Sequence, residues 1–287
     1  MSKYVLITDA TIDLPLNIVE QLDIEVIPMN FEINGKTYHH YPDEREMPIK
    51  EFYSMLENGT MPTTAQVTPF VYEEVFKKFL EQGLDILCIV FSSGLSGTYQ
   101  SASIAKEEML EKYPDRKIFC IDSKCASVGE GILVYHAAKK RLEGMELEEL
   151  SNWVEESKYN VRHWFTVEDL YHLNRGGRVS SLEAFVGTAL KIKPVLSVDE
   201  DGKLVVVSKV RGTKKALIYM LEKLTEEGAN IKEQTVFVGH GDNIESAEKL
   251  KSILLEDNLV KDAIITNIGP IIGSHTGPGM VALVFMR

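Results

Sequence analysis

The sequence predicts an α/β protein with two lobes, an N-terminal three-layer lobe with a mainly parallel sheet and a C-terminal mixed α/β lobe. Three observations carry this prediction. Strand and helix signals alternate through the first half of the chain, which is typical of right-handed crossovers over a parallel sheet. Residues 86–91 are all apolar, as in a strand buried on both faces. The second half instead contains a predicted hairpin and ends in a strand, which indicates a mixed sheet.

The chain length allows two hydrophobic cores. A chain of 287 residues is long enough for two lobes with separate cores. We expect the boundary near residue 159, which divides the chain into residues 1–158 and 159–287.

The first lobe is expected to begin with a strand at residues 4–8. Asn34-Gly35, between two short β-prone segments, is a strong hairpin signal. A helix should start at Thr68-Pro69, because proline is favoured at the first helical position. The other expected elements are strands at residues 4–8, 25–29, 86–91 and 117–121, and helices at 13–22, 48–56, 99–112 and 131–142.

The second lobe is expected to contain a hairpin around the turn at residues 199–202. Its predicted strands lie at residues 161–167, 195–198, 204–210, 235–239, 263–268 and 281–285. Its predicted helices lie at residues 182–191, 214–227 and 246–256.

Charge and composition exclude several classes of protein. A net charge of −12 argues against nucleic acid as the main partner. The basic residues are unevenly spread, because residues 171–215 hold nine lysines or arginines and four acids. No apolar run reaches the roughly 18 residues that a membrane-spanning helix needs, and the first residues show no signal-peptide pattern. Cys88, Cys120 and Cys125 lack disulfide or metal-ligand spacing, so we expect a reducing cytoplasm.

Four loop clusters rich in Gly, Ser, Thr and Pro stand beside predicted strands, and they are the candidate binding residues. Hydroxyls and backbone N–H groups can hold a carboxylate or phosphate by short hydrogen bonds without adding a buried positive charge. The loop before the helix at 99–112 lies where ligands bind in open α/β sheets. The clusters are residues 8–11, 62–66, 92–98 and 269–279, and His275 is the titratable group among the glycines of the last one.

Enzyme motifs fit the sequence poorly. Residues 94–98 fall one glycine short of a nucleophile elbow, and there is no Walker pattern or dinucleotide glycine triplet. Ser96 and His275 could pair as nucleophile and base, but the orienting acid, Asp9 or Asp122, is a guess. The seven histidines show no zinc spacing, and His39 and His40 are expected to face solvent. A Ser/His hydrolase and a carrier of another acidic small molecule stay as alternatives.

Together the clusters resemble the DegV family of bacterial fatty-acid-binding proteins, the acyl-carrying partners of a fatty acid kinase. The resemblance covers essentially the whole chain. Ala10 and Ala65 stand where the family usually has serine. The matching motifs are Thr-Asp-x-Thr at residues 8–11, Pro-Thr-Thr-x-Gln at 62–66, Ser-Ser-Gly-Leu-Ser-Gly-Thr-Tyr-Gln-Ser-Ala at 92–102, Asp-Ser at 122–123, Arg-Gly-Gly-Arg at 175–178, Lys-Pro-Val-Leu at 193–196 and Gly-Pro-x-Ile-Gly-x-His-Thr-Gly-Pro-Gly at 269–279.

The resemblance implies one long-chain fatty acid between the lobes, with its tail in an apolar tunnel. The carboxylate would be held by Thr63 or Thr64 and by Ser96 or Ser93, with His275 close by. The implied supporting residues are Asp9, Gly94, Gly97, Arg175 and Thr276. The candidate tunnel residues are Phe31, Phe70, Phe165, Phe185 and Ile271, although core packing is an alternative role for each.

The resemblance also implies a partner kinase that supplies ATP and makes an acyl phosphate, with a role in phospholipid synthesis. Arg211 resembles the kinase-facing basic residue, and Lys209 and Lys214 lie beside it. The chain itself would then be non-catalytic and need no cofactor or metal. Nucleic acid and integral membrane segments are not expected, whereas transient contact with a membrane surface stays open.

Overall fold

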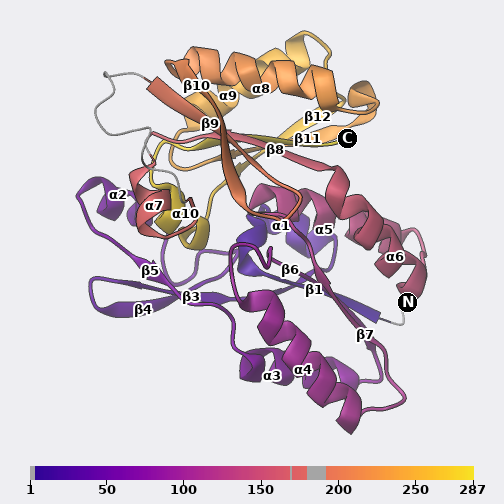
Figure 1. Ribbon diagram of the computed structural model, residues 1–287. Helices are drawn as coiled ribbons and strands as arrows, with labels where there is room; N and C mark the ends of the chain where they lie inside the picture. The colour runs from indigo at the N-terminus through magenta and orange to yellow at the C-terminus, as the bar shows by residue number, and fades with distance from the viewer. Residues whose placement is uncertain (1–3, 169, 180–191) are drawn as a thin grey trace.

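A computed structural model describes residues 4–168, 170–179 and 192–287, and its centre is two sheets with helices around them (Figure 1). The first, here the parallel sheet, has the strand order β2-β1-β6-β7, and all its neighbours run parallel. It consists of β1 (Tyr4–Asp9), β2 (Glu25–Ile27), β6 (Asp85–Val90) and β7 (Ile118–Asp122).

Helices cover both faces of the parallel sheet, which confirms the predicted three-layer lobe. Alternate residues of β1 face opposite cores, because side chains alternate across a strand. Leu6 belongs to one hydrophobic cluster and Ile7 to the other. On the Ile7 side lie α2 (Ile49–Glu57), α3 (Pro69–Leu80) and α4 (Thr98–Lys112). On the Leu6 side lie α1 (Leu16–Gln21), α5 (Val128–Leu142) and α6 (Leu147–Ser157).

A small antiparallel sheet projects from the parallel sheet. It consists of β3 (Met29–Ile33), β4 (Lys36–His40) and β5 (Thr63–Thr64) in the order β4-β3-β5. The predicted hairpin is confirmed, because Ile33 pairs with Lys36 and both turn residues have positive φ. The predicted strand at residues 25–29 is wrong in one respect. It is two strands in two sheets, separated by Pro28, which has no N–H to donate to a ladder.

The second lobe holds the mixed sheet, with the order β10-β9-β8-β13-β11-β12. Only β11 and β12 run parallel, and the other neighbours are antiparallel. Its strands are β8 (Val161–Thr166), β9 (Ile192–Val198), β10 (Leu204–Arg211), β11 (Thr235–His240), β12 (Asp262–Asn267) and β13 (Val281–Met286).

The helix α5 lies between the two sheets. One hydrophobic cluster contains Leu87 of the parallel sheet, Ile132 of α5 and Phe237 of the mixed sheet. The other face of the mixed sheet is covered by α8 (Thr213–Glu227) and α9 (Ile244–Glu256), at the top of Figure 1. The helix α5 therefore packs against both sheets, from its first residue Val128 onward.

Three elements differ from the sequence-based expectation. The helix α6 and the short helix α7 (Tyr171–Arg175) were not predicted, and the expected loop at residues 269–279 contains α10 (Pro270–Thr276).

The expectation that His40 faces solvent is wrong. His40 is buried, because it packs against Gly269, which has no Cβ to occupy that space. The helix predicted at residues 182–191, with Phe185, lies outside the described residues. The remaining elements are 3-10 turns at η1 (Ala10–Ile12), η2 (Lys158–Asn160) and η3 (Ile231–Glu233).

A search of the described part of the chain finds no helix with the length and apolar character needed to cross a bilayer.

Candidate ligand-binding site

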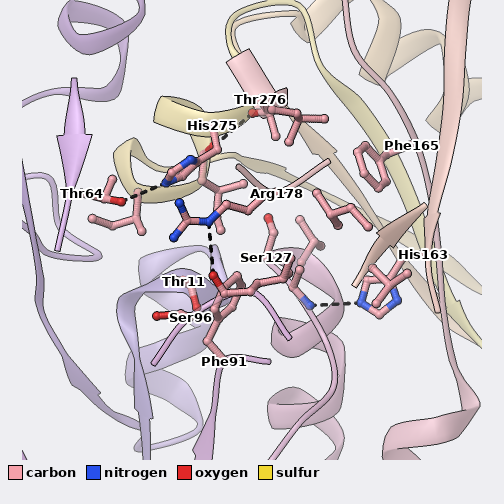
Figure 2. Close-up of a pocket in the computed structure, with 18 of the residues that line it drawn as sticks. Thr11, Thr64, Phe91, Ser96, Ser127, His163, Phe165, Arg178, His275 and Thr276 are labelled. Atoms are coloured by element: carbon pink, nitrogen blue, oxygen red, sulfur yellow. Dashed lines mark hydrogen bonds between the residues drawn. The ribbon is translucent and has the colours of Figure 1, made fainter. Parts of the chain in front are cut away.

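A cavity of about 230 Å³ lies between the two sheets, and all four polar loop clusters contribute to its wall (Figure 2). Its polar lining residues include Thr11, Thr64, Ser96, Arg178 and His275. Its apolar lining residues include Phe91, Leu95, Leu173, Ile271, Ile272, Met280 and, from the mixed sheet, Phe165, Val198, Leu204, Ala282 and Val284. The cavity is thus amphipathic, with hydrogen-bonding groups at one side and an apolar sheet at the other.

Thr64 and His275 meet at the polar side, although 211 residues separate them. The Thr64 Oγ1 atom lies 2.9 Å from His275 Nε2, in hydrogen-bond distance. His275 belongs to α10, which begins at Pro270. Every other residue of this helix is buried. Burial, followed by the charges of Arg178 and Arg175, lowers the pKa of His275 to about 4. The imidazole is therefore neutral near pH 7 and acts as a hydrogen-bonding group.

The two threonines of the 62–66 cluster have different positions. Thr63 is exposed and is not among the cavity-lining residues, whereas Thr64 is half-buried and lines the cavity. Neighbouring strand residues point to opposite faces, and β5 pairs with β3 through both. Of the two threonines that the sequence left open, Thr64 is therefore the one whose side of β5 faces the cavity.

The two serines of the 92–98 loop separate in the same way. Ser96 lines the cavity, and its Oγ atom lies 2.9 Å from Thr98 Oγ1. Ser93 is exposed, and its hydroxyl donates to Asp122, which also pairs with Lys124 at 2.8 Å. Ser96 is thus the serine that lines the cavity, while Ser93 belongs to a surface network.

Two glycines of this loop allow close packing. A Cβ at Gly97 would lie 2.2 Å from Gln66 Oε1, so this position joins two of the four clusters. A Cβ at Gly94 would lie 2.7 Å from the Asp201 carbonyl oxygen, in the β9–β10 turn. Both predicted supporting glycines therefore hold the walls of the cavity together.

The Arg-Gly-Gly-Arg motif places its two arginines differently. Arg175 donates to the Ser274 carbonyl at 3.3 Å, which ties α7 to α10. Arg178 lines the cavity, and its Nε donates to the Leu95 carbonyl at 3.2 Å. Within the described ranges Arg178 forms no ion pair with an acid, and burial lowers its pKa. Arg178 was missing from the predicted site residues, although the motif itself marked it.

The remaining predicted supporting residues, Asp9 and Thr276, form hydrogen bonds with backbone groups. The Asp9 carboxylate accepts hydrogen bonds from the Thr11 and Phe91 N–H groups, at 3.0 and 3.1 Å, and so joins the ends of β1 and β6. Thr276 lines the cavity, and its hydroxyl donates to the Ile272 carbonyl at 3.2 Å. Asp9 therefore holds Thr11, which lines the cavity, without lining the cavity itself, whereas Thr276 is part of the wall.

A buried carboxyl group that no sequence motif marked joins the two lobes and binds Ser127, which lines the cavity. Asp13 accepts from the Gly269 N–H at 2.8 Å and from the Ser127 hydroxyl at 2.5 Å. Burial raises the pKa of Asp13 to about 7. Nearby Glu130, fully buried and bonded to Thr8 and Thr11, has a pKa raised well above its ordinary value by burial. No sequence pattern marked these positions, because their partners come from distant segments.

Asp13→Asn is expected to make stability depend less on pH. The raised pKa means that folded Asp13 keeps a proton which the unfolded chain releases, so its contribution falls as pH rises from about 4 to about 7. Asparagine keeps the shape without this loss, and we expect a relative gain of up to about 4 kcal/mol at pH 8. Urea unfolding at pH 5 and pH 8 measures this, with the exposed Asp115→Asn as control. Parallel pH profiles for wild type and Asp13→Asn would contradict it.

Ser96 and His275 are not hydrogen-bonded to each other, as a Ser/His hydrolase would require. His275 Nε2 is paired with Thr64, and Ser96 is paired with Thr98. Asp9 and Asp122 bind other partners, so neither orients His275. Among the described residues, no group of three or more His, Cys, Asp or Glu is arranged to hold a metal ion.

The predicted basic surface is separate from the cavity. Arg211 and Lys209 lie on β10, at the edge of the mixed sheet, and Lys214 lies in the first turn of α8. All three are exposed.

Comparison with known proteins agrees with the fold and the motifs. Residues 3–287 match the family model described as "Uncharacterised protein, DegV family". The chain belongs to the DegV family. It is 44% identical over 286 residues to a DegV domain-containing protein of Clostridium perfringens, covering 100% of this chain and 98% of the relative.

Solved DegV-family structures share the whole fold. One, described as fatty acid binding of a DegV family protein from Thermus thermophilus, has a TM-score of 0.88 and 30% identity, covering 99% of both chains. Another, described as DegV, a fatty acid binding protein from Bacillus subtilis, has a TM-score of 0.85 and 29% identity, covering 100% of both chains. The two-lobed α/β fold of this chain is therefore the DegV fold.

Proposed function

We propose that this chain binds one long-chain fatty acid in the cavity between its lobes, residues 1–158 and 159–287. The observation that carries the proposal is the amphipathic lining. Thr64, Ser96 and His275 supply hydrogen-bonding groups at one side, and an apolar sheet face forms the other (Figure 2). The related DegV structures from Thermus thermophilus and Bacillus subtilis, both described as fatty acid binding, support the same ligand class.

The tail supplies most of the affinity in this proposal. Each buried methylene contributes about 0.8 kcal/mol, so about fourteen of them supply on the order of 10 kcal/mol before ordering costs. A hydroxyl hydrogen bond adds roughly 1 kcal/mol, and more when it meets a charge. The polar cluster therefore orients the carboxylate, and Arg178 adds the positive charge that the hydroxyls lack.

Isothermal titration with saturated fatty acids of increasing length tests this proposal. We expect one site per chain and an affinity that rises with each added methylene until the cavity is filled. Binding that is equally strong for acetate-sized and long acids would contradict a tail-dominated site. Failure of all acids to bind would overturn the proposed function.

We further propose that the chain is the non-catalytic, cofactor-free partner of a fatty acid kinase. The kinase would phosphorylate the presented carboxylate for phospholipid synthesis. Exposed Arg211, Lys209 and Lys214 form the proposed kinase-facing surface. The free cysteines Cys88, Cys120 and Cys125 support a reducing, cytoplasmic location.

Ser96→Ala is expected to separate binding from presentation. Loss of one hydroxyl contact should weaken fatty acid binding by roughly fivefold, or about 1 kcal/mol. Acyl phosphate formation should fall much further, because the carboxylate is no longer held in the orientation that the kinase needs. Titration and a coupled kinase assay measure the two effects, with Ser93→Ala as the matched control. Equal losses in both assays would contradict this division of roles.

Arg211→Glu is expected to leave fatty acid affinity unchanged and to abolish acyl phosphate formation by the kinase. The residue is exposed on β10 and is not among the cavity-lining residues. Reversal of its charge places repulsion on the proposed docking surface. Lys232→Glu, on the exposed η3 turn, serves as the charge-matched control. Unchanged acyl phosphate production by Arg211→Glu would remove this residue from the kinase-facing surface.

A further inference from the structure

The hairpin formed by β9 and β10 reaches from the mixed sheet toward the N-terminal lobe (Figure 1). Its tip, residues 199–203, meets the loop that carries Ser96. Among the described residues, one hydrogen bond joins this tip to the N-terminal lobe, and it runs from Ser92 Oγ to the Gly202 carbonyl at 2.8 Å. Ser92 is fully buried. The hairpin therefore connects the two lobes through the same loop that lines the polar side of the cavity.

Two glycines make this contact close. A Cβ at Gly94 would lie 2.7 Å from the Asp201 carbonyl oxygen and 2.8 Å from the Gly202 carbonyl oxygen. Gly202 has a φ of +77°, which favours glycine, and a Cβ there would overlap Ser92 Oγ. A side chain at either position would push the tip away from the N-terminal lobe. The tip is therefore seated in a contact that depends on both glycines.

The hairpin also forms part of the cavity wall. Val198 and Leu204, which pair across its two strands next to the tip, both line the cavity. Leu204 packs against the hydrophobic cluster that contains α5. Because these two residues adjoin the tip, a movement of the tip would carry this part of the wall with it.

The end of the hairpin has little support from the rest of the mixed sheet. Within the described strands, β8 pairs with β9 at Val195 and Leu196, so Val198 has β10 as its ladder partner. β10 is an edge strand, and its register shifts at Val207, as at a β-bulge. This shift lies level with Val195 and Leu196, where the pairing with β8 ends. Beyond it the hairpin is a two-stranded ribbon, which has little stability of its own.

We propose that the β9–β10 hairpin is the gate through which the fatty acid enters and leaves the cavity. In the closed state the tip is latched by Ser92 and Gly202, and Val198 and Leu204 complete the wall. In the open state this hydrogen bond is broken and the hairpin bends at Val207. The inference rests on the proposed function and adds a control of access to the same site.

Stopped-flow mixing with cis-parinaric acid, a fluorescent long-chain acid, tests the gate on the wild-type protein. We expect the observed binding rate to level off as the concentration of the acid rises, because opening of the hairpin then limits entry. An observed rate that keeps rising in proportion to the concentration would overturn the gate, because entry would not wait for a change in the protein.

Ser92→Ala is expected to accelerate association and dissociation alike, by about fivefold each, while Kd stays within about twofold of wild type. The lost hydrogen bond latches the closed hairpin both with and without a bound acid, so its removal favours opening in both states. Gly94→Ala should also accelerate both steps, because its methyl group displaces the tip. Ser93→Ala is the matched control, since its hydroxyl bonds to Asp122 rather than to the hairpin, and it should keep wild-type rates.

The outcomes separate this inference from the function on which it rests. Wild-type rates in Ser92→Ala, or weaker binding without faster association, would overturn the gate while fatty acid binding stands. Failure of the wild-type protein to bind cis-parinaric, stearic or oleic acid would overturn the proposed function itself. The concentration series on the wild-type protein decides the question even if neither variant folds.

Discussion

Ala282→Leu is expected to reduce the affinity for long-chain fatty acids by roughly 100-fold. Ala282 lies on β13, is 4% exposed and lines the cavity. It is paired with Phe165 of the neighbouring strand β8, on the same wall. The added carbons occupy the space of three or four methylenes of the ligand, each worth about 0.8 kcal/mol. Their exclusion removes about 3 kcal/mol, which corresponds to roughly two orders of magnitude in Kd.

A chain-length series provides the control within the same variant. Short acids that do not reach Ala282 should bind Ala282→Leu and wild type equally, whereas long acids should separate them. Thermal unfolding without ligand checks that overpacking, which typically costs about 1–3 kcal/mol, has not disturbed the fold. An equal loss of affinity at every chain length would contradict the proposed path of the tail along the mixed sheet.

Arg178→Met is expected to weaken fatty acid binding by roughly 10- to 100-fold. The guanidinium lines the cavity and is held by the Leu95 carbonyl rather than by an acid of the described chain. A bound carboxylate would therefore be its ionic partner. Charge-assisted hydrogen bonds contribute about 1.5–3 kcal/mol, which corresponds to the expected range. Methionine keeps the apolar stem and removes the charge.

Arg175→Met is the matched control for this prediction. Its arginine donates to the Ser274 carbonyl and is not among the cavity-lining residues. The affinity of Arg175→Met should stay within a few-fold of wild type. A larger loss in Arg175→Met than in Arg178→Met would assign the carboxylate contact to the first arginine of the motif.

Local patterns were sufficient to predict much of the fold. The Asn34-Gly35 turn, the apolar strand β6 and the alternation of strands with helices each depend on neighbouring residues. Elements were missed where local signals conflict with tertiary packing. The glycine- and proline-rich segment that forms α10 has the composition of a loop, yet its residues from Pro270 to Ser274 are all buried.

The site could be predicted only in part, for a geometric reason. The four clusters converge on one cavity, as their shared composition and their places beside strands suggested. The choice between Thr63 and Thr64 depends on which face of β5 points inward, and a two-residue strand carries no periodicity to show it. The Asp13 contacts with Ser127 and Gly269 span more than 100 residues and leave no trace in sequence spacing.

The most direct test of a fatty acid held between the lobes is native mass spectrometry of the protein purified from bacterial cells, before and after denaturation. We expect the native protein to exceed its polypeptide mass of 32.3 kDa by one long-chain acid, and denaturation to release it. Extraction then identifies that acid. A native protein of bare polypeptide mass that also fails to take up added long-chain acids would contradict the account.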